Sequence, residues 1–228
     1  MKKDLLLLHG ALGTKNQFRD LIPLLENSYT LHNINFQGHG GRKSDKDFSV
    51  SLFSENVIEY LKINQLSNVI VFGYSMGGYV ALNIASQNKS CFSKIITLGT
   101  KFNWTPTSAS KEVKMLNPKL INEKVPHFAH KLEKEHAPLD WEEMMNKTAK
   151  MMLDLGNGLA LTSSNYQKIL IPVYLGIGSK DTMVSIEETQ DVHKSLHNSK
   201  LIILEEAPHS IEKINPEEIA AFISKSDS

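Results

Sequence analysis

Residues 69–78 read Val-Ile-Val-Phe-Gly-Tyr-Ser-Met-Gly-Gly, and the fold is decided by this stretch. The apolar residues predict a buried strand that ends near Gly73, and the residues after Ser75 follow a helical pattern with one apolar stripe. A Gly-x-Ser-x-Gly pentamer between a strand and a helix is typical of a nucleophile elbow, a sharp turn that lifts a serine hydroxyl above a sheet. We therefore expect Ser75 to be a nucleophile and the Met76 backbone N–H to point at an oxyanion beside it.

Short apolar runs alternate with helical patterns along most of the chain, which is the rhythm of an α/β protein with a parallel sheet. The expected strands cover Lys3–His9, Thr30–Phe36, Asn68–Gly73, Lys94–Gly99, Ile169–Gly176 and Lys200–Glu205. The expected helices cover Asn16–Leu25, Leu52–Ile63, Met76–Gln87, Ile186–Leu196 and Pro216–Ser224. The pattern predicts a mainly parallel sheet of about six strands that is flanked by helices.

The alternation of strands and helices stops between Thr100 and Lys168, where methionine, tryptophan, histidine and lysine accumulate. An amphipathic stripe runs from Trp141 to Leu155, and Gly156 is placed to end that helix. Another helix is expected to begin at Pro126. The sequence thus predicts a core of residues 1–99 and 169–228 with a helical cap, 100–168, inserted in it.

A serine nucleophile needs a base, and the base needs an acceptor that fixes its tautomer. On a sheet of this kind the acid and then the histidine follow the serine along the chain, each after a strand. Asp181 and His209 both follow an expected strand in this order. Glu205 and Glu206 are alternative acids, but they belong to the strand that supplies the histidine, so Asp181 is preferred.

The first expected strand runs into His9-Gly10-Ala11-Leu12-Gly13. A tetrahedral oxyanion needs two converging donors, and a backbone N–H just after a strand supplies one without a special side chain. We expect the Ala11 N–H to pair with the Met76 N–H. His9 is expected to bind backbone groups and to organise this loop.

Composition excludes several other classes of function. The chain has 25 basic and 25 acidic residues, so no overall field attracts it to nucleic acid or to an anionic membrane. No apolar run approaches the ~20 residues of a membrane span, and Cys91 has no second cysteine to pair with, so a cytoplasmic location is expected. A full Gly-x-Gly-x-x-Gly motif is missing, and although His127 and His130 could share a helix face, no i, i+4 histidine pair with a supporting glutamate appears. We therefore expect neither a cofactor nor a metal.

The ordered motifs together resemble the α/β-hydrolase superfamily, in its branch with a serine nucleophile. The resemblance covers His-Gly-x-x-Gly, Gly38-His39-Gly40, the elbow, and the aspartate and histidine loops. It implies an acyl-enzyme mechanism with Ser75, Asp181 and His209 as the triad. The family usually opens with an antiparallel hairpin, which we do not expect here, because the chain starts at the His-Gly strand.

Within this branch the elbow looks like that of small carboxylesterases, including carrier-protein methyl-ester esterases. We therefore expect hydrolysis of carboxylic esters or thioesters with a small to medium apolar acyl group. Candidate residues of the pocket are Tyr74, Trp104, Phe128, Trp141 and Met145. Two alternatives stay open: a lyase like that of the menaquinone pathway or a C–C hydrolase with the same triad, and a ligand receptor with slow turnover. The sequence leaves monomer and homodimer undecided.

Overall fold

The computed structural model describes residues 2–87 and 91–227. Within these residues six strands form one sheet, and every neighbouring pair is parallel, so the expected parallel sheet is confirmed. The strands are β1 (Lys3–Leu8), β2 (Tyr29–Ile34), β3 (Val69–Tyr74), β4 (Phe92–Leu98), β5 (Val173–Gly178) and β6 (Ser199–Leu204). Their order across the sheet is β2-β1-β3-β4-β5-β6. The two strands that come next in the chain, β2 and β3, lie on opposite sides of β1. In open α/β sheets such a reversal of strand order leaves a crevice at the carboxyl ends of the strands, here of β1 and β3.

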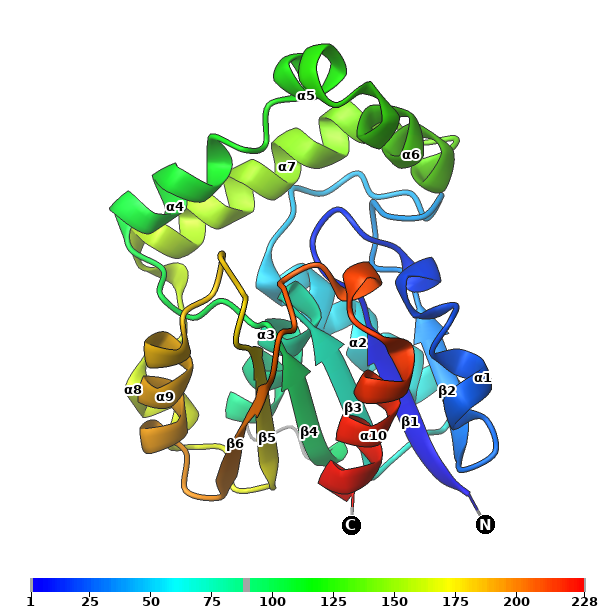
Figure 1. The fold of residues 1–228 in the computed structure, drawn as a ribbon, viewed down its shortest axis with the longest axis vertical. Helices are drawn as coiled ribbons and strands as arrows, with labels where there is room; N and C mark the ends of the chain where they lie inside the picture. Colours follow the sequence, from blue (N-terminus) through cyan, green and yellow to red (C-terminus); the bar gives the residue numbers. More distant parts are fainter. Residues whose placement is uncertain (1, 88–90, 228) are drawn as a thin grey trace.

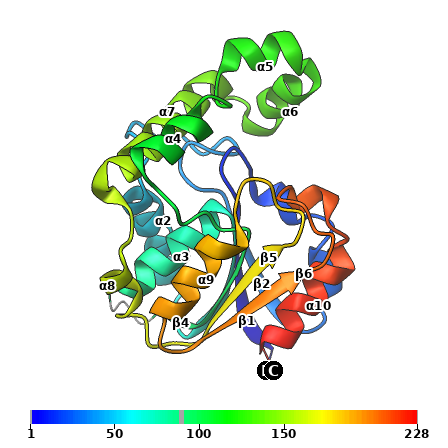
Figure 2. The same cartoon turned by 60° about the vertical axis from the view of Figure 1, so that its left-hand side comes forward.

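Helices cover both faces of the sheet (Figures 1 and 2). Alternate side chains of β1 enter two separate cores: Leu6 and Leu8 face α2, α3 and α9, whereas Leu5 and Leu7 face α1 and α10. These helices are α1 (Ile22–Leu25), α2 (Val50–Ile63), α3 (Met76–Ser86), α9 (Ile186–Ser195) and α10 (Pro216–Asp227), and the short α8 (Ser163–Tyr166) lies beside α9. In the described part of the chain, no helix combines the length and the apolar character needed to cross a membrane.

Four further helices, here termed the cap helices, lie beyond the carboxyl ends of the strands (Figures 1 and 2). They are α4 (Pro106–Val113), α5 (Pro118–Lys124), α6 (Pro126–His136) and α7 (Trp141–Asp154). Three of them start with proline, whose fixed φ suits the first helical position. Helix α7 ends in a wider turn, Leu155–Leu159, which Gly158 closes with a φ of 106°. Residues 100–168 as a separate cap domain remain a proposal.

Two expected elements were wrong in their extent, and proline explains both. The helix expected over Asn16–Leu25 is two short pieces, a 3-10 turn at Lys15–Phe18 and then α1. Pro23 has no N–H for a bond to the preceding turn, so a helix continuing through it is interrupted. The strand expected over Ile169–Gly176 begins only after Pro172, which cannot donate to the ladder, and it continues to Gly178.

Candidate active site

Ser75 occupies the single residue between the end of β3 and the start of α3. Its backbone has φ 49° and ψ −115°, a conformation that costs free energy for a residue with a Cβ. Neighbouring groups hold this turn: the Ser75 N–H donates to Leu98 O at 2.8 Å, and Ser75 O accepts from the Thr100 hydroxyl at 3.0 Å. The turn therefore projects the serine side chain beyond the carboxyl edge of the sheet.

The elbow glycines are required by close approaches of the backbone. A Cβ on Gly73 would overlap the backbone of Gly78, and a Cβ on Gly77 would overlap the carbonyl of Leu8 in β1. A Cβ on Gly78 would meet the Thr100 hydroxyl. Helix α3 can thus begin directly against β1 and β3 only where these positions carry no side chain.

His209 follows β6 and Asp181 follows β5; the His209 side chain reaches Ser75, and the Asp181 side chain reaches His209. His209 Nε2 lies 3.5 Å from Ser75 Oγ, and His209 Nδ1 lies 2.7 Å from Asp181 Oδ2. The Asp181 side chain is 1% exposed, and its Oδ1 accepts from the amides of Met183 at 2.8 Å and Val184 at 2.9 Å. Because the carboxylate accepts at both oxygens, Nδ1 carries the imidazole proton and the Nε2 lone pair faces the serine hydroxyl.

The alternative acids do not take part in this arrangement. Glu205 and Glu206 are exposed, and Glu206 pairs with Lys180 at 3.6 Å. Tyr74 instead holds the backbone of His209, because its hydroxyl donates to the His209 carbonyl at 2.9 Å. Burial raises the pKa of Tyr74 well above its usual value, so this hydroxyl keeps its proton.

Ala11 and Met76, the two residues expected to supply backbone amides, both lie beside the serine. Both residues line the cavity at Ser75, and among the described residues neither N–H donates to another group. Ala11 lies in a tight turn in which Gly13 N–H donates to Gly10 O at 3.2 Å. Met76 is the first residue of α3, where the helix presents its positive end. Both N–H groups are thus without a partner among the described residues, and their role as an oxyanion site remains a proposal.

Three histidines are buried together behind the loop after β1. The His9 ring lies 5.2 Å from that of His39, which lies 5.7 Å from that of His136 on α6. His9 donates from Nδ1 to Gly10 O at 2.8 Å and accepts at Nε2 from Phe36 N–H at 3.1 Å, so it binds the backbone as expected. Burial lowers the pKa of His9 to about 4 and lowers the pKa values of the other two. The cluster is therefore neutral near pH 7.

Ser75 lies between a narrow cavity of ≈ 50 Å³ and a wide cleft of ≈ 450 Å³. The narrow cavity reaches under the cap helices and is lined mainly by apolar side chains. They include Val50, Trp104, Met151, Met152, Leu155 and Val184. The wide cleft is bordered by the loop that carries His209 and by α6. Two differently shaped spaces thus meet at the serine.

The expected pocket residues divide into three groups. Trp104 lines the narrow cavity, and Tyr74 and Phe128 line the wide cleft. Trp141 and Met145 line neither space, because both are buried in the packing of the cap helices on the core. The walls of the two spaces beside Ser75 therefore do not include these two expected residues.

Sequence reasoning missed several residues beside Ser75. Met151, Met152 and Leu155 come from the carboxyl-terminal part of α7 and from the turn after it. The sequence does contain one signal for them: these residues lie near Gly156, where the helix ends and the chain turns back towards the sheet. Lys101 and Glu112 also line the narrow cavity, and no pattern in the sequence pointed to them.

Comparison with known proteins shows what this chain is similar to. It is 25% identical over 252 aligned positions to the uncharacterised hydrolase YugF of Bacillus subtilis, covering 98% of this chain and 89% of that protein. It is 22% identical to a pimeloyl-[acyl-carrier protein] methyl ester esterase of Neisseria meningitidis, covering 91% and 86%. The esterase EaEST of Exiguobacterium antarcticum shares the fold with a TM-score of 0.79 at 18% identity, covering 99% and 92%.

The family described as serine aminopeptidase, S33, matches residues 1–213. This match covers β1 to β6, the elbow, and the loops that carry Asp181 and His209. The chain therefore belongs to the serine aminopeptidase S33 family and is an α/β-hydrolase.

Proposed function

We propose that this protein hydrolyses carboxylic esters or thioesters through an acyl-enzyme on Ser75. The observation that carries the proposal is the chain of contacts from Ser75 through His209 to the buried Asp181, with the Ala11 and Met76 amides beside it. A nucleophile, a base, an orienting acid and an oxyanion site are the four parts that acyl transfer requires.

Acylation uses these groups in sequence. His209 Nε2 takes the proton from Ser75 Oγ as the oxygen attacks the ester carbonyl carbon. The carbonyl oxygen becomes an oxyanion, which accepts hydrogen bonds from the Ala11 and Met76 amides. The His209 imidazolium, stabilised by Asp181, then gives its proton to the leaving oxygen or sulfur as the carbonyl bond to it breaks. The 3.5 Å separation of Ser75 and His209 is expected to shorten when substrate binds.

Deacylation repeats the steps with water as the nucleophile. His209 removes a proton from the water as its oxygen attacks the acyl carbon, and the second oxyanion occupies the same two amides. The proton then passes from His209 to Ser75 Oγ as the acyl bond breaks. The products are a carboxylic acid and the free serine, and no cofactor takes part.

The two spaces suggest where the halves of the ester lie. The leaving group must receive a proton from His209 and then depart, and the wide cleft is bordered by Pro208, Ser210 and Glu212 of the histidine loop. The acyl group stays attached to Ser75, and the narrow apolar cavity of ≈ 50 Å³ suits it. We infer a short, mainly apolar acyl group and a larger leaving group.

The lyase alternative has little support in the site. The resemblance would require an arginine beside the elbow glycines, but Tyr79 follows Gly78, and its hydroxyl accepts from Leu161 N–H at 2.6 Å. The side chains of Arg19 and Arg42 line neither the narrow cavity nor the wide cleft. An ester or thioester of low charge is therefore the better substrate class.

Replacement of the nucleophile tests the proposal. In Ser75→Ala, kcat for p-nitrophenyl butyrate should fall on the order of 10⁶-fold, to the background rate, because no group remains to form the acyl-enzyme. Ser164→Ala, at an exposed position of α8, serves as the control and should keep the native rate. Undiminished turnover in Ser75→Ala would contradict the assignment.

Labelling separates hydrolysis from ligand reception. A fluorophosphonate probe should modify the native protein at Ser75 and leave Ser75→Ala unmodified, because only an activated serine displaces fluoride rapidly. A panel of p-nitrophenyl esters from acetate to octanoate should then give a maximum among the short chains. Rapid labelling without turnover of any ester would instead support the receptor alternative.

A further inference from the structure

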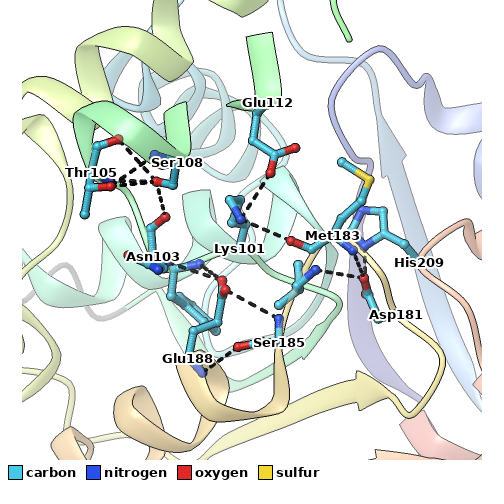
Figure 3. Close-up of polar contacts among 12 residues, drawn as sticks. Lys101, Asn103, Thr105, Ser108, Glu112, Asp181, Met183, Ser185, Glu188 and His209 are labelled. Carbon is cyan, nitrogen blue, oxygen red and sulfur yellow. Dashed lines mark hydrogen bonds and ion pairs between the residues drawn. The ribbon is translucent and has the colours of Figure 1, made fainter. Parts of the chain in front are cut away.

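Lys101 and Glu112 form an ion pair inside the narrow cavity beside Ser75. Lys101 lies just after β4 and Glu112 lies on the cap helix α4, and Lys101 Nζ is 3.3 Å from Glu112 Oε1. Figure 3 shows the pair; the side chains are only 15% and 11% exposed. Both residues line the cavity that Ser75 lines.

A charged pair is out of place in a cavity built only for an apolar acyl group. Removal of two ions from water costs free energy, which their mutual attraction offsets only where both are well satisfied by hydrogen bonds. The other lining side chains around the pair include Trp104, Met151 and Leu155. An apolar acyl group would gain nothing from the two charges, whereas a polar group on the substrate could form hydrogen bonds with them.

The pair has hydrogen-bonding capacity left over. The Lys101 ammonium has three N–H groups: one faces Glu112, and another donates to Met183 O at 3.1 Å (Figure 3). A carboxylate can accept several hydrogen bonds at its two oxygens, but among the described residues Lys101 is the only polar partner found for the Glu112 side chain. The ammonium also lies 5.8 Å from the centre of the Trp104 ring. One N–H of Lys101 and several acceptor positions of Glu112 therefore have no hydrogen-bond partner among the described residues, in a pair that lines the cavity.

The balance of charge decides which group could use them. A carboxylate on the substrate would meet Lys101 but would be repelled by Glu112, and an ammonium would meet the reverse conflict. A hydroxyl has no charge, accepts from the lysine through its oxygen and donates to the glutamate through its hydrogen. It is also small enough for a cavity of ≈ 50 Å³.

We propose that Lys101 and Glu112 form a subsite for a hydroxyl group on a short acyl chain, so that short hydroxyacyl esters are the preferred substrates. This inference rests on the proposed hydrolysis at Ser75 and names its substrate class. Lys101 and Glu112 line the same small cavity as Ser75, which is the space proposed for the acyl group. Lys101 and Glu112 are specificity residues in this scheme and take no part in bond breaking.

The test compares methyl butanoate with its 2-hydroxy and 3-hydroxy derivatives, with acid release followed in a pH-stat. For the native protein, kcat/KM for at least one hydroxy ester should exceed that for methyl butanoate by about tenfold or more, since a site that hydrogen-bonds a hydroxyl discriminates against the analogue lacking it. In Lys101→Met and in Glu112→Gln this ratio should fall towards one. Lys111→Met, at an exposed position of the same helix as Glu112, should keep the native ratio.

The remaining outcomes separate failure of the subsite from failure of the proposed function. Equal rates on the three esters in the native protein would overturn the hydroxyl subsite and leave hydrolysis intact. A hydroxyl preference that survives in both folded variants would also overturn the hydroxyl subsite. So would a protein that turns over none of the three esters although its Ser75 reacts with the fluorophosphonate. Absence of turnover together with an unreactive Ser75 would instead contradict the proposed function itself. The comparison in the native protein does not depend on the folding of any variant.

Discussion

Asp181 shows how much one buried side chain does in this site. One oxygen faces His209 Nδ1 at 2.7 Å, and the other accepts two backbone amides from the turn that follows, those of Met183 and Val184. Gly99, with φ 60°, packs against the same pair, since a Cβ there would lie 3.3 Å from Asp181 Oδ2. The carboxylate thus sets the imidazole tautomer and also shapes the loop that borders the narrow cavity.

Asp181→Asn should lower kcat for p-nitrophenyl butyrate on the order of 10⁴-fold. The amide can present an N–H to His209 Nδ1, which would move the imidazole proton to Nε2 and remove the lone pair that Ser75 needs. Steady-state kinetics provide the measurement. Asp191→Asn, at an exposed position on α9, is the control. A loss of less than tenfold would argue that His209 does not depend on Asp181.

At the scale of elements, two contacts attach the cap helices to the core around the site. Glu188 on α9 accepts from the amides of Phe102 at 2.8 Å and Asn103 at 3.3 Å, at the point where the chain leaves the sheet for α4 (Figure 3). His136 at the end of α6 donates to Leu12 O at 3.1 Å and accepts from Gly40 N–H at 3.1 Å. The second contact joins α6 directly to the loop that carries Ala11.

His136→Phe should destabilise the protein by about 1 to 3 kcal/mol, because it removes the partner of a partly buried carbonyl at Leu12 and of a partly buried amide at Gly40. It should also lower kcat more than it raises KM, since the Ala11 amide is placed by the same loop. Urea unfolding and ester kinetics would measure the two effects. His130→Phe is the matched control, since His130 lies on α6 with 79% of its side chain exposed. An unchanged midpoint in His136→Phe would contradict this role.

At the scale of the whole molecule, the buried histidines should make stability depend on pH. Burial lowers the pKa of His9 from 6.5 to about 4, and it also lowers the pKa values of His39 and His136. For His136 the nearby Glu135 carboxylate offsets part of the lowering. Below pH 6.5 the unfolded chain takes up protons that the folded chain does not, so the free energy of unfolding falls as the pH falls. The loss begins near pH 6.5 and continues through the folded value, and His9 alone should account for about 3 kcal/mol of it by pH 4.

Urea unfolding of the native protein at intervals from pH 7 to pH 4.5 would test this. His39→Phe should flatten the dependence, because it removes one group that titrates on unfolding. The change is suitable in shape, since the His39 ring stacks on Phe48 at 5.1 Å and its Nε2 has no partner among the described residues. His130→Phe should keep the native slope, since its side chain is exposed. A slope in His39→Phe equal to that of the native protein would contradict the argument.

Two features could be predicted from the sequence: the succession of strands along the chain, and the positions of Ser75, Asp181 and His209 directly after strands. These features depend on short-range rules: apolar runs form strands, glycine permits a sharp turn, and polar residues follow where a strand ends. The errors in extent, at Asn16–Leu25 and Ile169–Gly176, arise at prolines, which interrupt the hydrogen bonding of a helix or strand that the apolar pattern alone would extend. The catalytic roles of the three residues stay a prediction that kinetics must test.

The surroundings of the serine were decided only by the tertiary structure. An amphipathic stripe on α7 predicts that one face of the helix is buried, but it does not predict which part of that face lies at the site. Trp141 and Met151 belong to the same stripe, yet only Met151 lines the narrow cavity, whereas Trp141 packs in the core. Lys101 and Glu112 belong to a loop and a helix that meet through the docking of the cap helices. Such contacts depend on how whole elements pack, because side chains from several elements share one space, and no local pattern in the chain records that packing.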